Sequence, residues 1–405
     1  MWSPDVMTTS LDLDAVRAAF PALSSGFVFL DNAGGSQTLG RVADRIRDYL
    51  LTTNVQLGAS YGVSQASTAR VLDAAVATAR YIGASGPEEV VLGASTTQLL
   101  DNLSLAMEGT LAPGDEIVVT NVDHHANVGA WRRLEKRGVV LKTWNVDPSS
   151  WRLEARGLLP LLTKKTRLVA FTHASNLLGS VHDVSALTRV IHEHGARVCV
   201  DGVAYAPHRA IDVRAWDVDY YVFSFYKVYG PHIAVLYGKR ELLDGLDTIN
   251  HDFIGKQLPY KLQPGNVNFE LSHGLGGLYD YIDGLGGRIA AFDAIAAHEE
   301  RLAERLLGWL RERRGVRIHG ERTGDRALRV PTISFSVEGA APEAIVRAID
   351  PHGIGIRHGD FYAKGLVQAL GLADRGGVVR ISMVHYNTEA EIDRVIGALS
   401  NAIPA

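Results

Sequence analysis

Two ionisable side chains that could take part in catalysis lie at or just after the ends of short apolar runs. Asp201 ends RVCVD (197–201), and Lys227 follows YYVFS (220–224) between aromatic neighbours. A carboxylate at the end of a buried strand is costly unless it is paired. A lysine in apolar surroundings loses its proton more readily than usual, which suits Schiff-base chemistry. Asp201 and Lys227 are therefore the first catalytic candidates.

Hydroxyl side chains follow another apolar run, VVLG (90–93). Ser95, Thr96 and Thr97 stand at the predicted start of a helix. There they can cap the helix, or they can bind a phosphate together with the helix amides. Capping alone is the more frequent role of such a motif. Ser224, which ends YYVFS, adds a hydroxyl at the same predicted sheet edge.

His124 and Asn176 follow two further runs, EIVVT (116–120) and RLVAFT (167–172). A histidine at a strand end can stack on a planar ligand, and an asparagine offers a neutral donor and acceptor. The adjacent pair His124 and His125 suggests a metal at first sight. However, neighbouring side chains point in different directions, and no matching set of Cys, His and carboxylate accompanies them. We therefore expect no metal.

Together these residues describe one ligand, a planar pyridine aldehyde that carries a phosphate. Pyridoxal phosphate needs a lysine for its aldehyde and a carboxylate for its ring nitrogen. It also needs an anion site and a flat group on the ring face. The sequence supplies Lys227, Asp201, His124, the hydroxyls at 95–97 and Ser224, each after a predicted strand. We therefore expect this cofactor.

The elements that position these residues alternate between strands and helices. Eight apolar runs lie at 27–31, 90–93, 116–120, 139–143, 167–172, 197–201, 220–224 and 233–237. Continuous apolar runs predict strands buried on both faces of a mainly parallel sheet. Helical patterns between several runs, at 97–109, 126–137 and 184–195, favour an open α/β sheet. The last two runs are too close together for a helical crossover, so an antiparallel turn or a functional loop joins them.

The pattern changes after about residue 280. A long amphipathic helix is predicted over 287–315. Further strands and helices follow at 332–337, 342–350, 353–357, 378–383 and 389–402. The glycine-rich segment 274–287 is interpreted as a hinge or domain joint. We predict a large α/β domain over 23–280 and a smaller α+β domain from 1–22 and 281–405.

Composition narrows the class of protein. The chain has 405 residues, 46% hydrophobic and 21% charged, with a net charge of −4. This is typical of a globular protein with ample core and gives no support to nucleic-acid binding. Cys199 is the single cysteine, so no intrachain disulfide can form. We see no signal peptide and no membrane span, and we expect a cytoplasmic protein.

Seven motifs occur in order along nearly the whole chain. They are LDNAGGSQ (30–37), DHHANVGAW (123–131), SNLLGSVHDV (175–184), VDGVAYAPHRAIDV (200–213), SFYKVYGP (224–231), PGNVNFE (264–270) and VRISMVHYNTEAEID (379–393). In this combination the sequence resembles the class V aminotransferase group of fold-type I pyridoxal-phosphate enzymes. It is most similar to the cysteine desulfurase and selenocysteine lyase-like branch. The resemblance implies the fold-type I architecture and an amino-acid substrate.

The resemblance also implies roles for residues around the cofactor ring. Lys227 binds the cofactor as an imine, Asp201 pairs with the pyridine nitrogen, and His124 stacks on the ring. Asn176 lies near the ring hydroxyl. Arg380 binds the α-carboxylate of the substrate, a task that suits a bidentate guanidinium.

The phosphate site implied by the resemblance combines two subunits. Thr96, Thr97 and Ser224 hold the phosphate from one subunit. Asn266 or Asn268 reaches across from the second subunit of a homodimer, so the active sites are shared.

The sequence departs from the desulfurase pattern at the residues that handle sulfur. Tyr362 stands where the desulfurases carry a catalytic cysteine, and Cys199 lies inside a predicted strand. The family's glutamine is Ala204 here, and its histidine before the lysine is Tyr226. We therefore expect no persulfide relay. Arg357 and Tyr362 are expected to shape the substrate pocket.

Several reactions start from loss of the Cα proton, and the sequence does not separate them. We favour a lyase that eliminates from Cβ without a persulfide. Transamination comes second, and racemisation or epimerisation comes third. A non-catalytic homologue is disfavoured by the set of Lys227, Asp201 and His124. A nucleotide-dependent α/β enzyme is disfavoured because no G-x-G-x-x-G follows the first apolar run.

Overall fold

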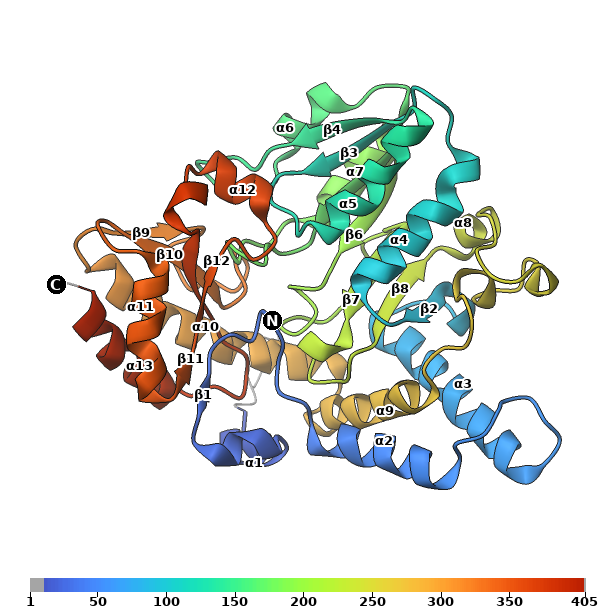
Figure 1. Cartoon of the computed structure of the whole chain (residues 1–405), viewed down its shortest axis with the longest axis horizontal. Coiled ribbons are helices and arrows are strands. Elements are labelled where there is room, and N and C mark those ends of the chain that lie inside the picture. The colour runs from blue at the N-terminus through green and yellow to red at the C-terminus, as the bar shows by residue number, and fades with distance from the viewer. Residues whose placement is uncertain (1–10, 404–405) are drawn as a thin grey trace, which may run out of the picture.

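A seven-stranded sheet forms the centre of the computed structural model, which describes residues 11–403 (Figure 1). Its strands run in the order β2-β8-β7-β6-β5-β3-β4. They are β2 (Val90–Gly93), β3 (Glu116–Thr120), β4 (Val140–Trp144), β5 (Thr166–Thr172), β6 (Arg197–Asp201), β7 (Tyr220–Ser224) and β8 (Ala234–Gly238). Neighbouring strands are parallel except at β8, which is antiparallel to β2 and β7. The predicted mainly parallel sheet is confirmed.

Helices cover both faces of this sheet, as the continuous apolar runs require. On one face, α4 (Thr96–Met107) and α5 (Ala126–Arg132) share a core with alternate strand residues such as Val119. On the other face, α7 (Val184–Glu193) and α3 (Gly62–Ile82) pack on the intervening residues such as Val118. The sheet is therefore buried on both sides except at its edge strand β4, and the polar residues of its central strands gather at the strand ends.

The connection between β7 and β8 is both antiparallel and short. A single 3₁₀ turn, Phe225–Lys227, follows β7, and the chain then returns along it as β8. The backbone N–H of Phe225 donates to the carbonyl of Ile233 at 2.8 Å, which closes the connection. This short link fixes Lys227 at the carboxyl end of β7.

A second, smaller sheet occupies the C-terminal part, in the order β12-β13-β10-β9, and is antiparallel throughout. Its strands are β9 (Val316–His319), β10 (Thr332–Val337), β12 (Arg357–Gly359) and β13 (Val378–Ser382). Helices α10 (Arg288–Arg311), α11 (Pro342–Ile349) and α13 (Glu389–Ala402) share its apolar core. The predicted α+β character of this part is confirmed.

The remaining helices lie outside these two layers or cover their edges. They are α1 (Leu13–Ala18), α2 (Gly40–Thr52), α6 (Ala155–Leu158), α8 (Arg240–Asp244), α9 (Phe269–Gly284) and α12 (Lys364–Ala369). No helix within residues 11–403 has the length and apolar character needed to cross a membrane. The division of the chain at 22/23 and 280/281 stays a prediction, and its first ten residues lie outside the described part.

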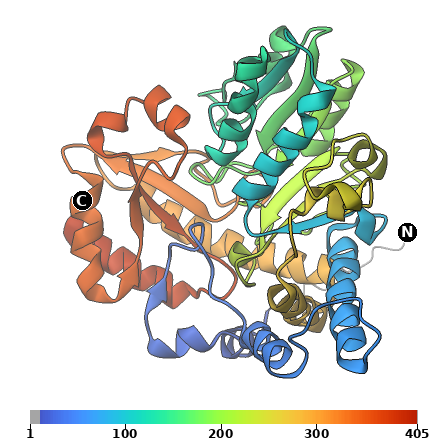
Figure 2. The same ribbon diagram turned by 45° about the vertical axis from the view of Figure 1, so that its right-hand side comes forward.

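The first apolar run, 27–31, does not join the large sheet as we expected. Its strand β1 (Val28–Phe29) is short and pairs in parallel with β11 (Ile354–Gly355). The side chains of Val28 and Leu30 belong to the core of the C-terminal part. Figures 1 and 2 show this blue segment beside the orange and red elements. The run is apolar because it completes that core, and it ends at Asp31 beside Ser382.

The glycine-rich segment 274–287 is helical over most of its length and is not a flexible hinge there, while its place at a domain joint stays a prediction. It forms the greater part of α9, which packs against α2. A Cβ on Gly274 would lie 2.7 Å from Cγ1 of Ile46, and a Cβ on Gly277 would lie 2.9 Å from the backbone of Arg41. These glycines allow two helices to approach closely. A turn between α9 and α10 occurs only at the end of the segment.

We expect Gly277→Ala to lower the free energy of unfolding by about 1–3 kcal/mol, because the new methyl group meets helix backbone that cannot rotate away. The matched control is Gly284→Ala at the end of the same helix, where a Cβ has open space. This control should be neutral or slightly stabilising, since alanine favours helix. Denaturant unfolding of both variants measures the difference. Equal stabilities would contradict the close-packing explanation.

Candidate active site

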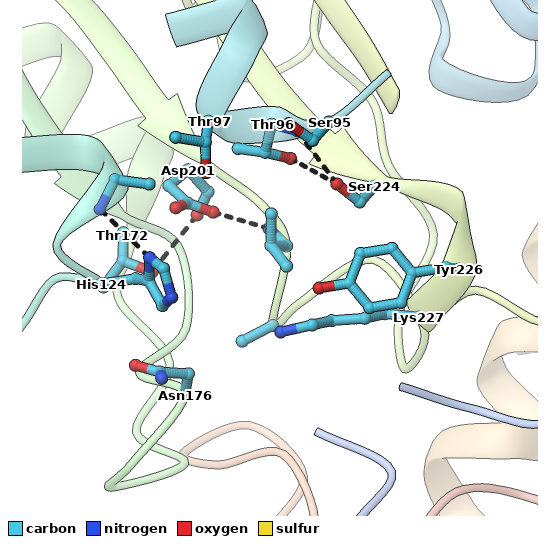
Figure 3. Close-up of a pocket in the computed structure, with 13 residues that line it drawn as sticks. Ser95, Thr96, Thr97, His124, Thr172, Asn176, Asp201, Ser224, Tyr226 and Lys227 are labelled. Carbon is cyan, nitrogen blue, oxygen red and sulfur yellow. Dashed lines mark hydrogen bonds between the residues drawn. The ribbon is translucent and has the colours of Figure 1, made fainter. Parts of the chain in front are cut away.

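A cavity lies at the carboxyl ends of the parallel strands, where the chain passes from strand to loop. Side chains from the loops after β2, β3, β5, β6 and β7 converge there (Figure 3). The predicted residues that line it are Ser95, Thr96, Thr97, His124, Asn176, Asp201, Ser224, Tyr226 and Lys227. The structure therefore brings together candidates that are spread over more than 130 positions of the sequence.

Lys227 points into this cavity from the turn after β7 and is buried. Burial lowers the pKa of its ammonium to about 8, and the positive charge of Arg380 adds to this effect. Asp201 and Asp31 act in the opposite direction. A substantial fraction of the side chain is therefore a neutral amine, and hence a nucleophile, near physiological pH.

Asp201 ends β6 on the opposite wall of the cavity and is also buried. One of its oxygens, Oδ1, accepts a hydrogen bond from the backbone N–H of Val203 at 2.9 Å. Burial raises the pKa of the carboxyl to about 6, so it is still ionised at neutral pH. A buried anion with few hydrogen bonds favours a cationic partner, such as a protonated ring nitrogen.

An anion site forms at the start of α4. Ser95 caps this helix through a hydrogen bond from Gln98, and the free amides of the first turn carry partial positive charge. The Thr96 hydroxyl lies 2.7 Å from the Ser224 hydroxyl, and the Thr96 N–H donates to the same Ser224 oxygen at 3.2 Å. The helix can be capped and can bind an anion at the same time, because the Ser95 side chain makes the cap while Thr96, Ser224 and the helix amides remain for the anion.

His124 lies on the far side of the cavity with its ring held in place. Its Nδ1 accepts a hydrogen bond from the backbone N–H of Ala126 at 3.1 Å. Burial and the nearby charge of Lys227 lower the pKa of the imidazole to about 4. The ring is therefore neutral at physiological pH, so it can stack on a planar ligand without the cost of desolvating a charge.

A second cavity opens beside the first and shares His124, Asn176, Tyr226 and Lys227 with it. Arg380, on β13, lies at its base and is nearly fully buried. Its guanidinium donates to the backbone carbonyl of Asn176 at 3.0 Å. This is the cation that the sequence analysis associated with a substrate carboxylate.

Arg357 and Tyr362 lie at the rim of the second cavity. The Tyr362 ring lies 5.1 Å from the His124 ring, and its exposed fraction is 63%. Tyr226 is half-buried and stacks on His232, with 4.9 Å between ring centroids. Arg357, Tyr362 and Tyr226 thus line the second cavity together with Lys227.

Asn266 and Asn268 are exposed, and neither lines the two cavities. The side chain of Asn268 caps α9 by accepting a hydrogen bond from the N–H of Leu271 at 2.8 Å. Their predicted contact with the phosphate needs a second subunit and stays a prediction.

Two residues at the site were not identified from the sequence. Asp31 forms an ion pair with Arg380, with 2.7 Å between Oδ1 and Nη2. The sequence offers the same indication for Asp31 as for Asp201, because each is an acidic residue at the end of an apolar run. Phe361 accepts a hydrogen bond from the Asn176 amide at 2.8 Å through its backbone carbonyl. Any residue type has a backbone carbonyl, so the sequence gives no indication of this contact.

The donor set fits pyridoxal phosphate. A buried amine can bind the aldehyde, and a buried carboxylate with a single amide hydrogen bond can bind the ring nitrogen. Helix amides with the Thr96 and Ser224 hydroxyls can bind the phosphate, and the neutral ring of His124 can cover one face. Among residues 11–403, no group of three or more His, Cys, Asp or Glu side chains could hold a metal.

Fold and site thus fit an enzyme that uses pyridoxal phosphate, and comparison with known proteins identifies its family. The class-V aminotransferase model matches residues 28–395, so the chain belongs to this family. Aminotransferase-like protein FGM3 of Gibberella zeae is 46% identical over 402 residues, which cover 97% of this chain and 98% of that protein. The cysteine desulfurase of Haloferax volcanii is 32% identical over 426 residues, or 97% of each chain.

A solved structure agrees with this assignment. The apo cysteine desulfurase from Thermococcus onnurineus NA1 superposes with a TM-score of 0.87 at 27% identity, and the match covers 96% of this chain and 98% of that one. The fold is therefore the fold-type I architecture, and the predicted desulfurase-like branch is confirmed. Pyridoxal phosphate is the cofactor of this family, and the protein is a pyridoxal-phosphate-dependent enzyme.

The lowered pKa of Lys227 predicts how cofactor loading depends on pH. Only the neutral amine attacks the aldehyde, so the loading rate should rise as the pH approaches 8 and level off above it. A lysine with its ordinary pKa of 10.5 would give a rate that still rises above pH 9. The measurement is the appearance of the visible band after apoenzyme is mixed with cofactor between pH 6.5 and 9.5. Reaction with free Nα-acetyl-lysine corrects for ionisations of the cofactor itself.

Borohydride reduction and peptide mapping identify the loaded residue, which we expect to be Lys227. Arg380→Leu removes a neighbouring positive charge and should move the pH midpoint upward. A midpoint near pH 10 in the unmodified protein, or label on another lysine, would contradict the assignment.

Proposed function

We propose that this enzyme acts on an amino acid and eliminates a sulfur-containing group from Cβ without a persulfide on the protein. The observation that carries the proposal is the contrast between a complete cofactor site and a single cysteine buried inside β6. In the elimination the Cα–H and Cβ–S bonds break and a Cα=Cβ bond forms. The sulfur leaves as a thiol or sulfide, and the enamine product hydrolyses in water to pyruvate and ammonia.

The side chains of the site have distinct roles in this proposal. When bound, pyridoxal phosphate supplies a planar electron-withdrawing ring that stabilises negative charge at the substrate Cα. Lys227 takes the Cα proton on its Nζ and can return it. Asp201 holds the proton of the ring nitrogen, and His124 excludes water from one ring face.

Substrate orientation depends on the second cavity. Arg380 binds the α-carboxylate, and its position beside Lys227 supports delivery of the Cα proton to Nζ. Asn176 holds the loop of Phe361 and Tyr362 against the site through its hydrogen bond to the Phe361 carbonyl. Arg357 and Tyr362 then contact the substrate side chain at the entrance.

The state of Cys199 supports a route without persulfide. The thiol is fully buried in β6, and burial together with the charge of Asp201 raises its pKa well above the usual value. A persulfide relay needs a thiolate that reaches both the substrate sulfur and an acceptor. A thiol in the middle of a sheet offers neither a thiolate nor a mobile chain.

Transamination is the second candidate function. The 46% identical relative bears the name aminotransferase-like protein, and the residues that take up the Cα proton would serve transamination equally. The two reactions differ in where the proton returns and in whether the substrate has a leaving group on Cβ.

A panel of amino acids that includes cysteine and β-substituted alanines tests these functions when pyruvate, keto acid and sulfide are measured separately. We expect pyruvate and sulfide in equal amounts from cysteine, and pyruvate with the corresponding thiol from an S-substituted cysteine. Transamination would give the keto acid of the donor without sulfide. Attack by a protein thiolate at sulfur would leave alanine and a persulfide on the protein, which mass spectrometry detects.

Cys199→Ala and Cys199→Ser should both retain most of the activity, because the side chain is a small core group. The serine variant is expected to be less stable, since it buries a hydroxyl among apolar residues. Loss of sulfide release with normal cofactor binding in both variants would contradict the proposal and make Cys199 the sulfur acceptor.

We also infer that the enzyme is a homodimer with shared active sites. Large apolar side chains are exposed along α2 and α3, including Leu50, Leu51 and Leu72, and such a face is typical of an interface. The exposed position of Asn266 and Asn268, away from the cavity of their own subunit, is consistent with a role in the partner. The expected cytoplasmic location stays a prediction.

Mixing two inactive variants tests the shared sites. Lys227→Ala removes the amine, and Asn266→Ala with Asn268→Ser shortens the reach toward the partner while serine keeps the cap on α9. After subunit exchange at equal amounts, half of the dimers are mixed and each has one intact site. We therefore expect about a quarter of the native activity. Two variants that stay inactive after proven exchange would contradict the arrangement, as would a monomer at micromolar concentration.

A further inference from the structure

Arg380 has its polar contacts concentrated on one edge of the guanidinium. Its Nη1 donates to the carbonyl of Asn176 at 3.0 Å, and its Nη2 donates to Asp31 Oδ1 at 2.7 Å. One face is covered by the Phe361 ring, 3.8 Å from the central carbon. The remaining donor, Nε, is buried and has no hydrogen-bond partner within residues 11–403.

This arrangement limits how a carboxylate can reach Arg380. The side chain is only 2% exposed, so the inaccessible Nε cannot receive a ligand from the cavity without movement of its neighbours. A ligand would have to bind Nη1 or Nη2, and these two atoms already donate hydrogen bonds to Asn176 and Asp31. Asn176 contributes a backbone carbonyl, whereas Asp31 contributes a side-chain carboxylate that is 24% exposed. A ligand carboxylate that binds Nη2 at this edge therefore has to replace Asp31.

A second guanidinium lies on the other side of Asp31. Nη1 of Arg357 is 3.6 Å from Asp31 Oδ2, beyond a direct hydrogen bond, and this arginine is 61% exposed. Gly34 adjoins the same carboxylate, and a Cβ there would lie 2.9 Å from Oδ2. The absence of a side chain at Gly34 leaves Asp31 room to rotate, and Arg357 offers a cation to rotate toward.

We propose that Asp31 is a placeholder carboxylate that occupies Arg380 in the empty enzyme and moves to Arg357 when the substrate carboxylate binds. The inference rests on the proposed function, in which Arg380 binds the substrate α-carboxylate. An unpaired buried guanidinium is costly, so the empty site needs an anion at Arg380. The exchange replaces one carboxylate by another, and neither arginine is left without a partner.

The exchange gives the two neighbours of Arg380 opposite effects on affinity. Asp31 competes for the guanidinium, so its neutralisation should tighten carboxylate binding. Arg357 receives the displaced Asp31, so its loss should weaken binding. If Asp31 instead fixes Arg380 in the right position, its neutralisation should weaken binding. The sign of the Asp31 effect therefore separates competition from positioning.

The test uses holoenzyme and propionate, a carboxylate without an amino group, with propionamide as the uncharged control ligand. Binding is followed by the thermal midpoint and by the visible band of the cofactor. We expect Asp31→Asn to bind propionate on the order of tenfold more tightly and Arg357→Gln to bind it several-fold more weakly. The affinity for propionamide should change little in either variant. The asparagine oxygen can still accept from Arg380, so the fold is preserved.

The double variant distinguishes exchange from simple charge attraction. Attraction alone predicts additive effects, whereas exchange predicts that Arg357→Gln loses most of its effect when Asp31 is already neutral. Weaker or unchanged binding by Asp31→Asn, additive effects, or no propionate binding to either protein would overturn the proposal. If no amino acid in the panel turns over, the proposed function fails, while the propionate titration still reports on the exchange.

Discussion

The active site depends on one constraint, which is that charged groups at the carboxyl edge of the large sheet are removed from water. Asp201 and Lys227 are buried there because they end or follow strands that are covered on both faces, and Arg380 is buried beside them on β13 of the smaller sheet. The same burial lowers the pKa of the lysine and raises that of the aspartate. Bound pyridoxal phosphate would offer an aldehyde to Lys227 and a basic ring nitrogen to Asp201, the partners that these two groups lack. Affinity for the ligand and reactivity of the side chains therefore have one physical origin.

Much of this arrangement could be predicted because parallel strands order the chain in a simple way. Every apolar run of the large sheet except β8 ends at the same edge, so the residue at or after the end of such a run is a candidate for the site whatever its distance in sequence. Lys227, Asp201 and His124 were found in this way. Their roles at the cofactor came from the combination of types, since no single residue was specific.

The features that were missed depend on contacts that residue types do not encode. The run 27–31 looks like any other buried strand, yet it pairs with a segment more than 320 residues away. Asp31 was overlooked for that reason, because its partner Arg380 lies in the C-terminal part. The glycines of α9 suggested flexibility, and only the position of α2 shows that they serve close packing. In each case the deciding neighbour is remote in sequence.

The loop of Phe361 and Tyr362 is held against the large sheet by two main-chain hydrogen bonds and by the buried ring of Phe361. The Phe361 carbonyl accepts from the Asn176 amide, and the Tyr362 carbonyl accepts from the His125 N–H at 2.8 Å. Both residues have positive φ angles, 51° and 60°, a conformation held by these contacts. The side chain at 362 therefore contributes little to the position of the loop. A different side chain at position 362 can therefore alter the chemistry beside His124 while the scaffold keeps its shape.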